Sequence, residues 1–279
     1  MYAYFLYFYL NVGKHVQKPL EYNTVHFEKG VGTMSDQNYL KRTVKKETVY
    51  SKHLNETRHL RIYLPPGYTN LKSYSILYCQ DGQDVFMFGR IATIANYLTL
   101  ERDMEPVIVV GVDVEKQFRT SEYAPIGARN PAYKKFFAEE LLPFVEERYQ
   151  KRNEGIDRLL IGDSLGGTVS LDLALDYPDL FQHIISLSGA YLQPTLDRLR
   201  KMSDLNWLDM WMLIGTEETA VQTNSGTFNF LDLNRQAKKI LEEKGAKISY
   251  HEREGNHIWG FWQKHLPEAL IHYFGESKF

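Results

Sequence analysis

The sequence has 279 residues, of which 43% are hydrophobic and 24% are charged, and its formal net charge is −2. This size and composition fit one globular domain with an ordinary hydrophobic core, and the near-neutral charge argues against binding to nucleic acid or to an acidic membrane surface. The single cysteine, Cys79, cannot form an internal disulfide, so we predict a reducing, cytoplasmic location.

The first ten residues, MYAYFLYFYL, are strongly apolar but supply only about half of the ~20 residues that a membrane-spanning helix needs. They also lack the cationic start and the small-residue cleavage site of a secretory signal. We therefore treat residues 1–33 as an amino-terminal extension. One explanation is that native translation begins at Met34, because the preceding EKGVGT can be encoded by a purine-rich stretch that resembles a bacterial ribosome-binding site. Residues 34–279 are then expected to form one domain, since no repeat or linker interrupts the sequence from about residue 40 onward.

Apolar runs and helical patterns alternate along this domain. Strands are predicted at residues 58–65, 74–79, 106–113, 158–162, 183–189, 210–215 and 247–253. Helices are predicted at residues 133–150, 167–178, 230–245 and 261–275, the second beginning near Gly166. Because several strands are unbroken apolar runs, we expect an α/β fold with a mostly parallel sheet covered by helices on both faces. In such a sheet, functional residues belong at the carboxyl ends of the strands.

A candidate nucleophile lies in RLLIGDSLGGTVS, where Ser164 occupies the turn between a predicted strand and a predicted helix. Such a tight turn requires small residues two positions before and after the serine, and Gly162 and Gly166 meet that need. The start of the following helix offers free N–H groups that can stabilise an oxyanion. The alternative is a chance G-x-S-x-G in a loop, which the flanking strand and helix make the weaker interpretation.

A serine hydroxyl needs a base, and His257 lies between the last predicted strand and the final helix, where hydrolases of this architecture place their histidine. Taken alone, His257 would be read as a structural loop residue. The acid that orients the histidine should lie between the other two residues in the chain. The stretch MWMLIGTEE places two carboxylates, Glu217 and Glu218, directly after a strand, and spacing alone does not choose between them.

An oxyanion hole needs two convergent N–H donors. One is expected from Leu165, the residue after the serine, and the other from Gln83 in the loop YCQDGQDVF, where Gly82 allows a close approach of the backbone. An ordinary Asp-Gly turn is the alternative for this loop. Cys79, just before it, is expected to be a small buried hydrophobic residue and not a nucleophile.

From about residue 55 onward the chain resembles the Putative esterase family of α/β hydrolases, which includes enterochelin esterases, feruloyl esterases, S-formylglutathione hydrolase and mycolyltransferases. The resemblance rests on LYCQDGQDVF, RTSEYAP, RLLIGDSLGGTVSLDLALDYPDLF, IGTEE and GNHIWGFW, taken in order. The DGQ loop is similar to that of the bacterial enterochelin-esterase-like branch. The resemblance implies an α/β-hydrolase fold and a serine esterase that needs no metal or cofactor.

The resemblance also implies site residues: Ser164 as nucleophile, His257 as base, Glu218 as the acid three residues past Gly215, and Arg119 near the substrate pocket. Two features depart from the family. The segment before residue 55 is too short for the separate amino-terminal domain of true enterochelin esterases, and the acid is a glutamate where feruloyl-type members have an aspartate.

We therefore expect a carboxylic ester hydrolase that acts on a small-molecule ester through an acyl-enzyme, with a Ser-His-Glu triad. One alternative substrate is a cyclic catecholate trilactone siderophore, which Arg119 and Arg90 could face. An alternative of another class is a pseudo-hydrolase that binds a ligand without turnover, but no triad position is broken. The sequence leaves the acyl and alcohol groups of the substrate open, and it leaves self-association into a homo-oligomer open.

Overall fold

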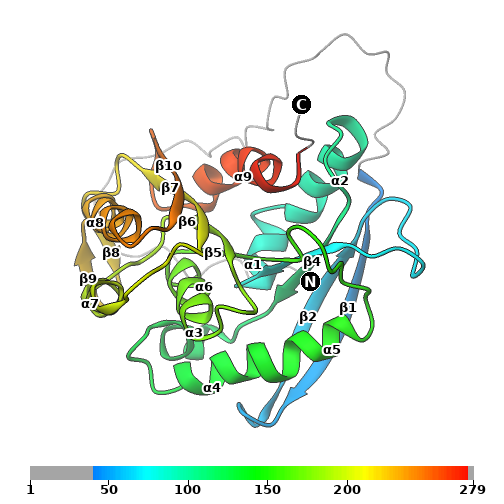
Figure 1. The fold of residues 1–279 in the computed structure, drawn as a ribbon, viewed down its shortest axis with the longest axis horizontal. Helices are drawn as coiled ribbons and strands as arrows, with labels where there is room; N and C mark the ends of the chain where they lie inside the picture. The colour runs from blue at the N-terminus through cyan, green and yellow to red at the C-terminus, as the bar shows by residue number, and fades with distance from the viewer. Residues whose placement is uncertain (1–39, 276–279) are drawn as a thin grey trace, which may run out of the picture. The chain divides into compact units, whose positions relative to one another are not determined.

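The computed structural model describes residues 40–275, so the proposed extension at 1–33 and the proposed start at Met34 lie outside the described residues. The described chain is built on an eight-stranded sheet in the order β1-β2-β4-β3-β5-β6-β7-β10 (Figure 1). Its strands are β1 (Thr43–Ser51), β2 (Glu56–Leu64), β3 (Ser75–Cys79), β4 (Val107–Val112), β5 (Arg158–Asp163), β6 (His183–Leu187), β7 (Asp209–Gly215) and β10 (Lys247–Arg253).

The sheet is parallel from β4 to β10, and β2 joins β4 in the antiparallel direction. The predicted α/β fold with a mostly parallel sheet is therefore confirmed, and the predicted strands are displaced by at most two residues at their ends. The prediction omitted β1, which pairs antiparallel with β2 at the edge. The first five side chains of β1 are exposed or half-buried and include Lys45 and Lys46, so this strand lacks the apolar run that marks the central strands.

Helices cover both faces of the sheet. They are α1 (Gly82–Met87), α2 (Ile91–Glu101), α3 (Lys116–Tyr123), α4 (Asn130–Lys135), the π-helical segment η2 (Phe136–Leu141), α5 (Leu142–Glu146), α6 (Leu165–Asp176), α7 (Gln193–Lys201), α8 (Phe230–Glu243) and α9 (Trp259–Phe274). Helices α1, α2 and α9 pack on one face, and α3 to α8 pack on the other. Strand β3 shows the alternation: Ile76 and Tyr78 belong to one core cluster, and Leu77 and Cys79 belong to the other.

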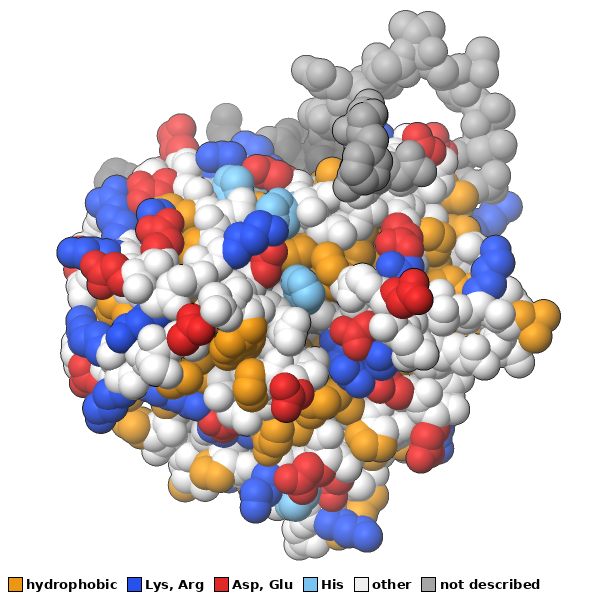
Figure 2. All heavy atoms as spheres, viewed as in Figure 1, with side chains coloured by type: hydrophobic (Ala, Val, Ile, Leu, Met, Phe, Trp, Pro, Cys, Tyr) orange, Lys and Arg blue, Asp and Glu red, His pale blue; other side chains and the backbone are white. Residues whose placement is uncertain are grey.

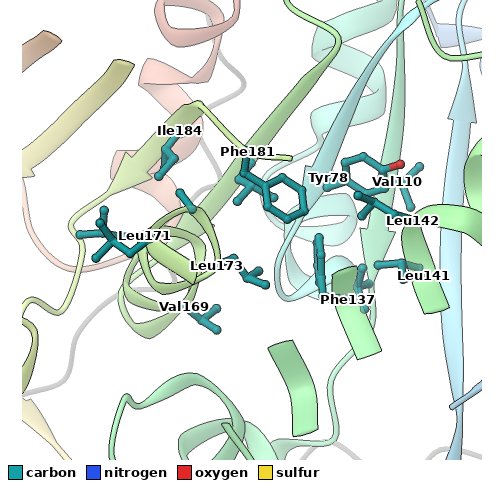
Figure 3. Packing of buried hydrophobic residues seen from close by; sticks show 14 of the residues in the cluster. Tyr78, Val110, Phe137, Leu141, Leu142, Val169, Leu171, Leu173, Phe181 and Ile184 are labelled. Atoms are coloured by element: carbon teal, nitrogen blue, oxygen red, sulfur yellow. The ribbon is translucent and has the colours of Figure 1, made fainter. Parts of the chain in front are cut away.

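The predicted helix at 133–150 is not one regular helix, because a π-helical turn separates α4 from α5. This turn ends just before Pro143, whose ring nitrogen has no hydrogen to donate to the preceding turn. The adjacent Phe136 and Phe137 in this segment are both fully buried. Phe137 contacts Tyr78 and Phe181 edge-on, with both centroid distances 5.8 Å (Figure 3).

Cys79 is fully buried in β3, as predicted, and burial raises the pKa of its thiol well above the usual value. The surface has a different character. Charged side chains of both signs are interspersed over the described part of the face shown in Figure 2, without a large area of one sign. Among residues 40–275, no helix is both long and apolar enough to cross a bilayer.

Candidate active site

Ser164 lies between the end of β5 and the start of α6, with φ 53° and ψ −121°. This conformation is rare for a residue with a side chain and turns the serine out at the carboxyl edge of the sheet. The predicted need for small neighbours holds in the structure, because a Cβ on Gly162 would lie 2.2 Å from the carbonyl carbon of Gly166. The backbone N–H of Ser164 donates to the carbonyl of Leu187 at 2.9 Å, which fixes the turn to the next strand, β6.

Two neighbouring strands end in the same way. Asp81 follows β3 with φ 50°, and Ser188 follows β6 with φ 49°. Neither is a glycine, so each of three adjacent strands, β3, β5 and β6, leads into a non-glycine residue with a left-handed φ. Backbone strain of this kind concentrates at functional sites, where the surrounding structure holds it in place.

The structure brings His257 and Glu218 together. The Nδ1 atom of His257 lies 2.7 Å from Oε2 of Glu218, whose side chain is fully buried. The second oxygen, Oε1, accepts hydrogen bonds from the Gly215 N–H at 2.9 Å and the Ser188 hydroxyl at 2.6 Å. Because an ionised carboxylate only accepts, Nδ1 of the neutral imidazole carries the hydrogen and Nε2 keeps its lone pair. This is the tautomer that a general base needs.

Glu217, the alternative acid, has another partner. Its carboxylate accepts a hydrogen bond from the side-chain amide of Asn256, and its backbone N–H donates to the carbonyl of Gly255 at 3.1 Å. It is exposed, whereas Glu218 turns inward. Of the two neighbouring carboxylates, the structure therefore places only Glu218 against the imidazole.

His257 lies in the loop after β10, and β6 and β7 separate β10 from β5 in the sheet. The loop is tied to the end of β7 by a hydrogen bond from the Thr216 N–H to the carbonyl of Arg253 at 2.8 Å. The imidazole contacts two aromatic rings, with centroid distances of 4.8 Å to Phe230 and 4.9 Å to Trp262. The side chain keeps only 15% of its surface exposed, so its orientation is strongly restricted.

The two candidate oxyanion donors lie in the first turns of two helices. Leu165 begins α6 and Gln83 is the second residue of α1, and neither backbone N–H donates to another described residue. A Cβ on Gly166 would lie 3.2 Å from Oδ2 of Asp81, so the start of α6 packs against the loop that leads into α1. The side-chain amide of Gln83 holds this loop through two hydrogen bonds to the backbone of Val114, at 3.0 and 3.1 Å.

Comparison with known proteins identifies the family. Residues 51–273 match the family model described as "Putative esterase". The chain belongs to the Putative esterase family. It is 39% identical to the uncharacterized protein YjcH of Bacillus subtilis over 82% of this chain and 96% of that protein. This confirms the resemblance that the sequence motifs indicated.

Solved structures in the comparison show the same α/β-hydrolase fold as this family member. A ferulic acid esterase superposes with a TM-score of 0.71 at 18% identity, covering 84% of this chain and 98% of that one. The enterobactin esterase of Shigella flexneri gives a TM-score of 0.70 at 20% identity, covering 82% of this chain and 59% of that one. The family member therefore spans the ferulic acid esterase almost completely and the enterobactin esterase only in part.

Arg119, expected near the substrate pocket, lies on α3 with its guanidinium against Asp81. Two hydrogen bonds of 2.7 and 2.8 Å join it to the two carboxylate oxygens, and a third, of 3.3 Å, reaches the carbonyl of Asp163. Arg119 thus joins Asp81 to Asp163. These residues lie two positions before Gln83 and Leu165, the candidate oxyanion donors. A direct contact with substrate stays a prediction.

Asp163 was not singled out from the sequence, although it directly precedes the nucleophile in GDSLG. Burial, and then repulsion from the Asp81 carboxylate, raise the pKa of Asp163 to about 7, while Arg119 opposes this shift. Its Oδ1 atom is buried without a hydrogen-bond partner among the described residues. In the part of the chain that the structure describes, no cluster of three or more His, Cys, Asp or Glu side chains is arranged to hold a metal ion.

Proposed function

We propose that the protein is a serine carboxylic ester hydrolase that works through an acyl-enzyme on Ser164. The observation that carries this proposal is the buried Glu218 carboxylate, which holds the His257 imidazole by Nδ1 at the same sheet edge where a strained turn presents Ser164. Nucleophile, base and acid follow strands β5, β10 and β7, the chain order Ser, acid, His that is typical of α/β hydrolases.

The reaction needs two acyl transfers. In the first, the Ser164 hydroxyl attacks the ester carbonyl carbon while its proton passes to Nε2 of His257. The carbonyl oxygen becomes an oxyanion, for which the N–H groups of Leu165 and Gln83 are the proposed donors. The alcohol leaves with the proton from His257, and the acyl group stays on Ser164. Water then attacks the acyl-enzyme by the same proton route and releases the carboxylic acid, while Glu218 remains ionised throughout.

The substrate class that fits the family is a small-molecule ester. The solved relatives include proteins named as a ferulic acid esterase and an enterobactin esterase. A catecholate trilactone remains the alternative substrate. It has less support, because the guanidinium of Arg119 is already bound to Asp81. A pseudo-hydrolase has less support, because the sequence keeps a serine, a glutamate and a histidine at the three proposed triad positions, after strands β5, β7 and β10.

Labelling with a fluorophosphonate probe tests the proposal without knowledge of the substrate. Only a serine activated by a base attacks the phosphorus readily at neutral pH, so we expect one adduct, on Ser164, and none in Ser164→Ala. The same two proteins should then be compared on short acyl esters, feruloyl esters, S-formylglutathione and ferric trilactones. An adduct on another residue, or none in folded protein, would contradict the proposal.

A further inference from the structure

The acid Glu218 is held by a residue that the sequence motifs did not indicate. Ser188, directly after β6, donates its hydroxyl hydrogen to Oε1 of Glu218 at 2.6 Å. Ser188 is fully buried, and its φ of 49° is one that a serine rarely adopts. A strained backbone that delivers a hydroxyl to a buried carboxylate indicates a function for that hydroxyl.

Trp262 completes this arrangement from the first turn of α9. Its indole Nε1–H donates to Oγ of Ser188 at 2.8 Å, and the side chain is 4% exposed. An indole N–H is only a donor, so the Ser188 oxygen must accept and its own hydrogen is directed to Glu218. Consecutive hydrogen bonds of this kind also polarise one another, which strengthens the bond to the carboxylate.

The same indole touches the base. The ring of Trp262 meets the His257 imidazole edge-on, at 4.9 Å between centroids and an angle of 86°. The four side chains therefore form a closed ring of contacts. Trp262 contacts His257 directly and is hydrogen-bonded to Ser188. Ser188 in turn is hydrogen-bonded to Glu218, which binds His257. A rotation of the carboxylate or of the imidazole would break at least one of these contacts.

We propose that Ser188 and Trp262 are positioning residues for catalysis: together they fix the orientation of the Glu218 carboxylate and thereby of the His257 imidazole. The proposal rests on the proposed esterase function, because it concerns the same acid and base. Their hydrogen bonds run to Glu218 and to each other, and not to the atoms that react. Their contribution should therefore appear in the rate of the acyl transfer and not in the binding of substrate.

The test compares Ser188→Ala and Trp262→Phe with wild type on an activated ester such as p-nitrophenyl acetate. Ser188→Ala removes the hydrogen bond to the Glu218 carboxylate, and Trp262→Phe removes the hydrogen bond that orients the Ser188 hydroxyl. For each variant we expect kcat to fall about 10- to 100-fold while KM changes less than about 3-fold. Trp262→Phe keeps an aromatic ring against the imidazole and isolates the N–H. Trp259→Phe is the matched control: Trp259 lies in the same helical turn and meets Trp262 edge-on at 5.4 Å, but its indole binds no described acceptor.

A double-mutant cycle separates positioning from general damage. If Ser188 and Trp262 act through one chain of hydrogen bonds, the double variant should lose less than the product of the two single losses. Ser188→Ala combined with Trp259→Phe should lose about as much as Ser188→Ala alone. Proton NMR gives an independent readout, because the His257 Nδ1 hydrogen bonded to Glu218 should resonate at low field in wild type and shift in both positioning variants.

The outcomes distinguish the two proposals. Active wild type with unchanged kcat and an unmoved Nδ1 resonance in Ser188→Ala and Trp262→Phe would overturn the positioning role and leave the esterase function intact. A raised KM with unchanged kcat would also overturn it. Wild type that neither hydrolyses esters nor reacts with the fluorophosphonate would overturn both. If the variants lose thermal stability, the Nδ1 resonance of the protein that remains folded at low temperature still decides the result.

Discussion

Glu218 accepts the Nδ1 hydrogen of His257 at 2.7 Å, while the adjacent Glu217 turns outward to Asn256. The two carboxylates are one position apart in the chain and have separate partners. The difference arises in the turn after β7, where the Glu218 N–H donates to the carbonyl of Gly215 at 3.1 Å and the Glu217 N–H donates to the carbonyl of Gly255.

We expect Glu218→Gln to lower kcat by about 10³- to 10⁴-fold, because an amide favours the wrong imidazole tautomer. Glu217→Gln should cost less than about tenfold. Both variants should be measured on one ester at saturation, with thermal unfolding recorded beside the kinetics. A severe loss in Glu217→Gln and a mild one in Glu218→Gln would reassign the acid.

Arg119 offers a second test. Its guanidinium holds Asp81 in two hydrogen bonds, so its removal should displace the loop that leads to Gln83. We expect Arg119→Lys to lower kcat about 10- to 100-fold, as small misplacements of catalytic groups do, with little change in KM for a neutral ester. Asp81→Asn should reproduce this pattern. A KM that rises for anionic esters alone would instead show that Arg119 contacts the substrate.

The buried Asp163 should make stability depend on pH. Its pKa in the folded protein is about 7, above the ~3.9 of an unfolded aspartate. Between these values the native state holds a proton that the unfolded state has released, so this group lowers the free energy of unfolding as the pH rises from about 4 to about 7. Asp163→Asn should remove that loss.

Urea unfolding of wild type and Asp163→Asn at pH 5 and pH 8 measures the effect. The variant should gain stability relative to wild type as the pH is raised. Parallel stabilities at the two pH values would show that Asp163 is not protonated preferentially in the folded state.

The turn at the nucleophile should tolerate no added carbon. A Cβ on Gly162 would lie 2.2 Å from the backbone of Gly166, so Gly162→Ala must move β5 or α6. We expect a loss of about 3 kcal/mol or more in the free energy of unfolding, and a melting temperature lower by several degrees. Gly260→Ala is the control, because the nearest atom to its Cβ is 4.0 Å away, in the side chain of Ile258. Equal melting temperatures for the two variants would contradict this reading of the turn.

The sequence predicted the structural context of the candidate site where it depends on local pattern, and the catalytic roles stay predictions. Ser164 and His257 could be located because each lies at a fixed position relative to a strand end and a helix start. Glu218 could not be separated from Glu217 by spacing, since the choice depends on how the turn after Gly215 folds. The family resemblance supplied that choice.

Residues whose partners lie far away in the chain could not be predicted from local sequence pattern. Trp262 and Ser188 are 74 positions apart in the chain, and Arg119 is 38 positions from Asp81. A lone tryptophan or arginine in a sequence is compatible with many partners, and only the folded sheet edge selects one. The short β8 (Val221–Thr223) and β9 (Gly226–Phe228) escaped prediction for a related reason, because three-residue strands carry too little periodicity to be distinguished from a loop.

Three residues with a positive φ follow strands β3, β5 and β6, and they limit how far the stability of this protein can be raised without loss of activity. Each costs on the order of 1–3 kcal/mol of folding free energy, and glycine at Asp81 or Ser188 would relieve much of that cost. Asp81→Gly would also remove the carboxylate that binds Arg119, and Ser188→Gly would remove the hydroxyl that donates to Glu218. Selection for heat resistance alone would therefore favour glycine at these positions and would lower activity while raising stability. Directed evolution of this protein must select for turnover in every round.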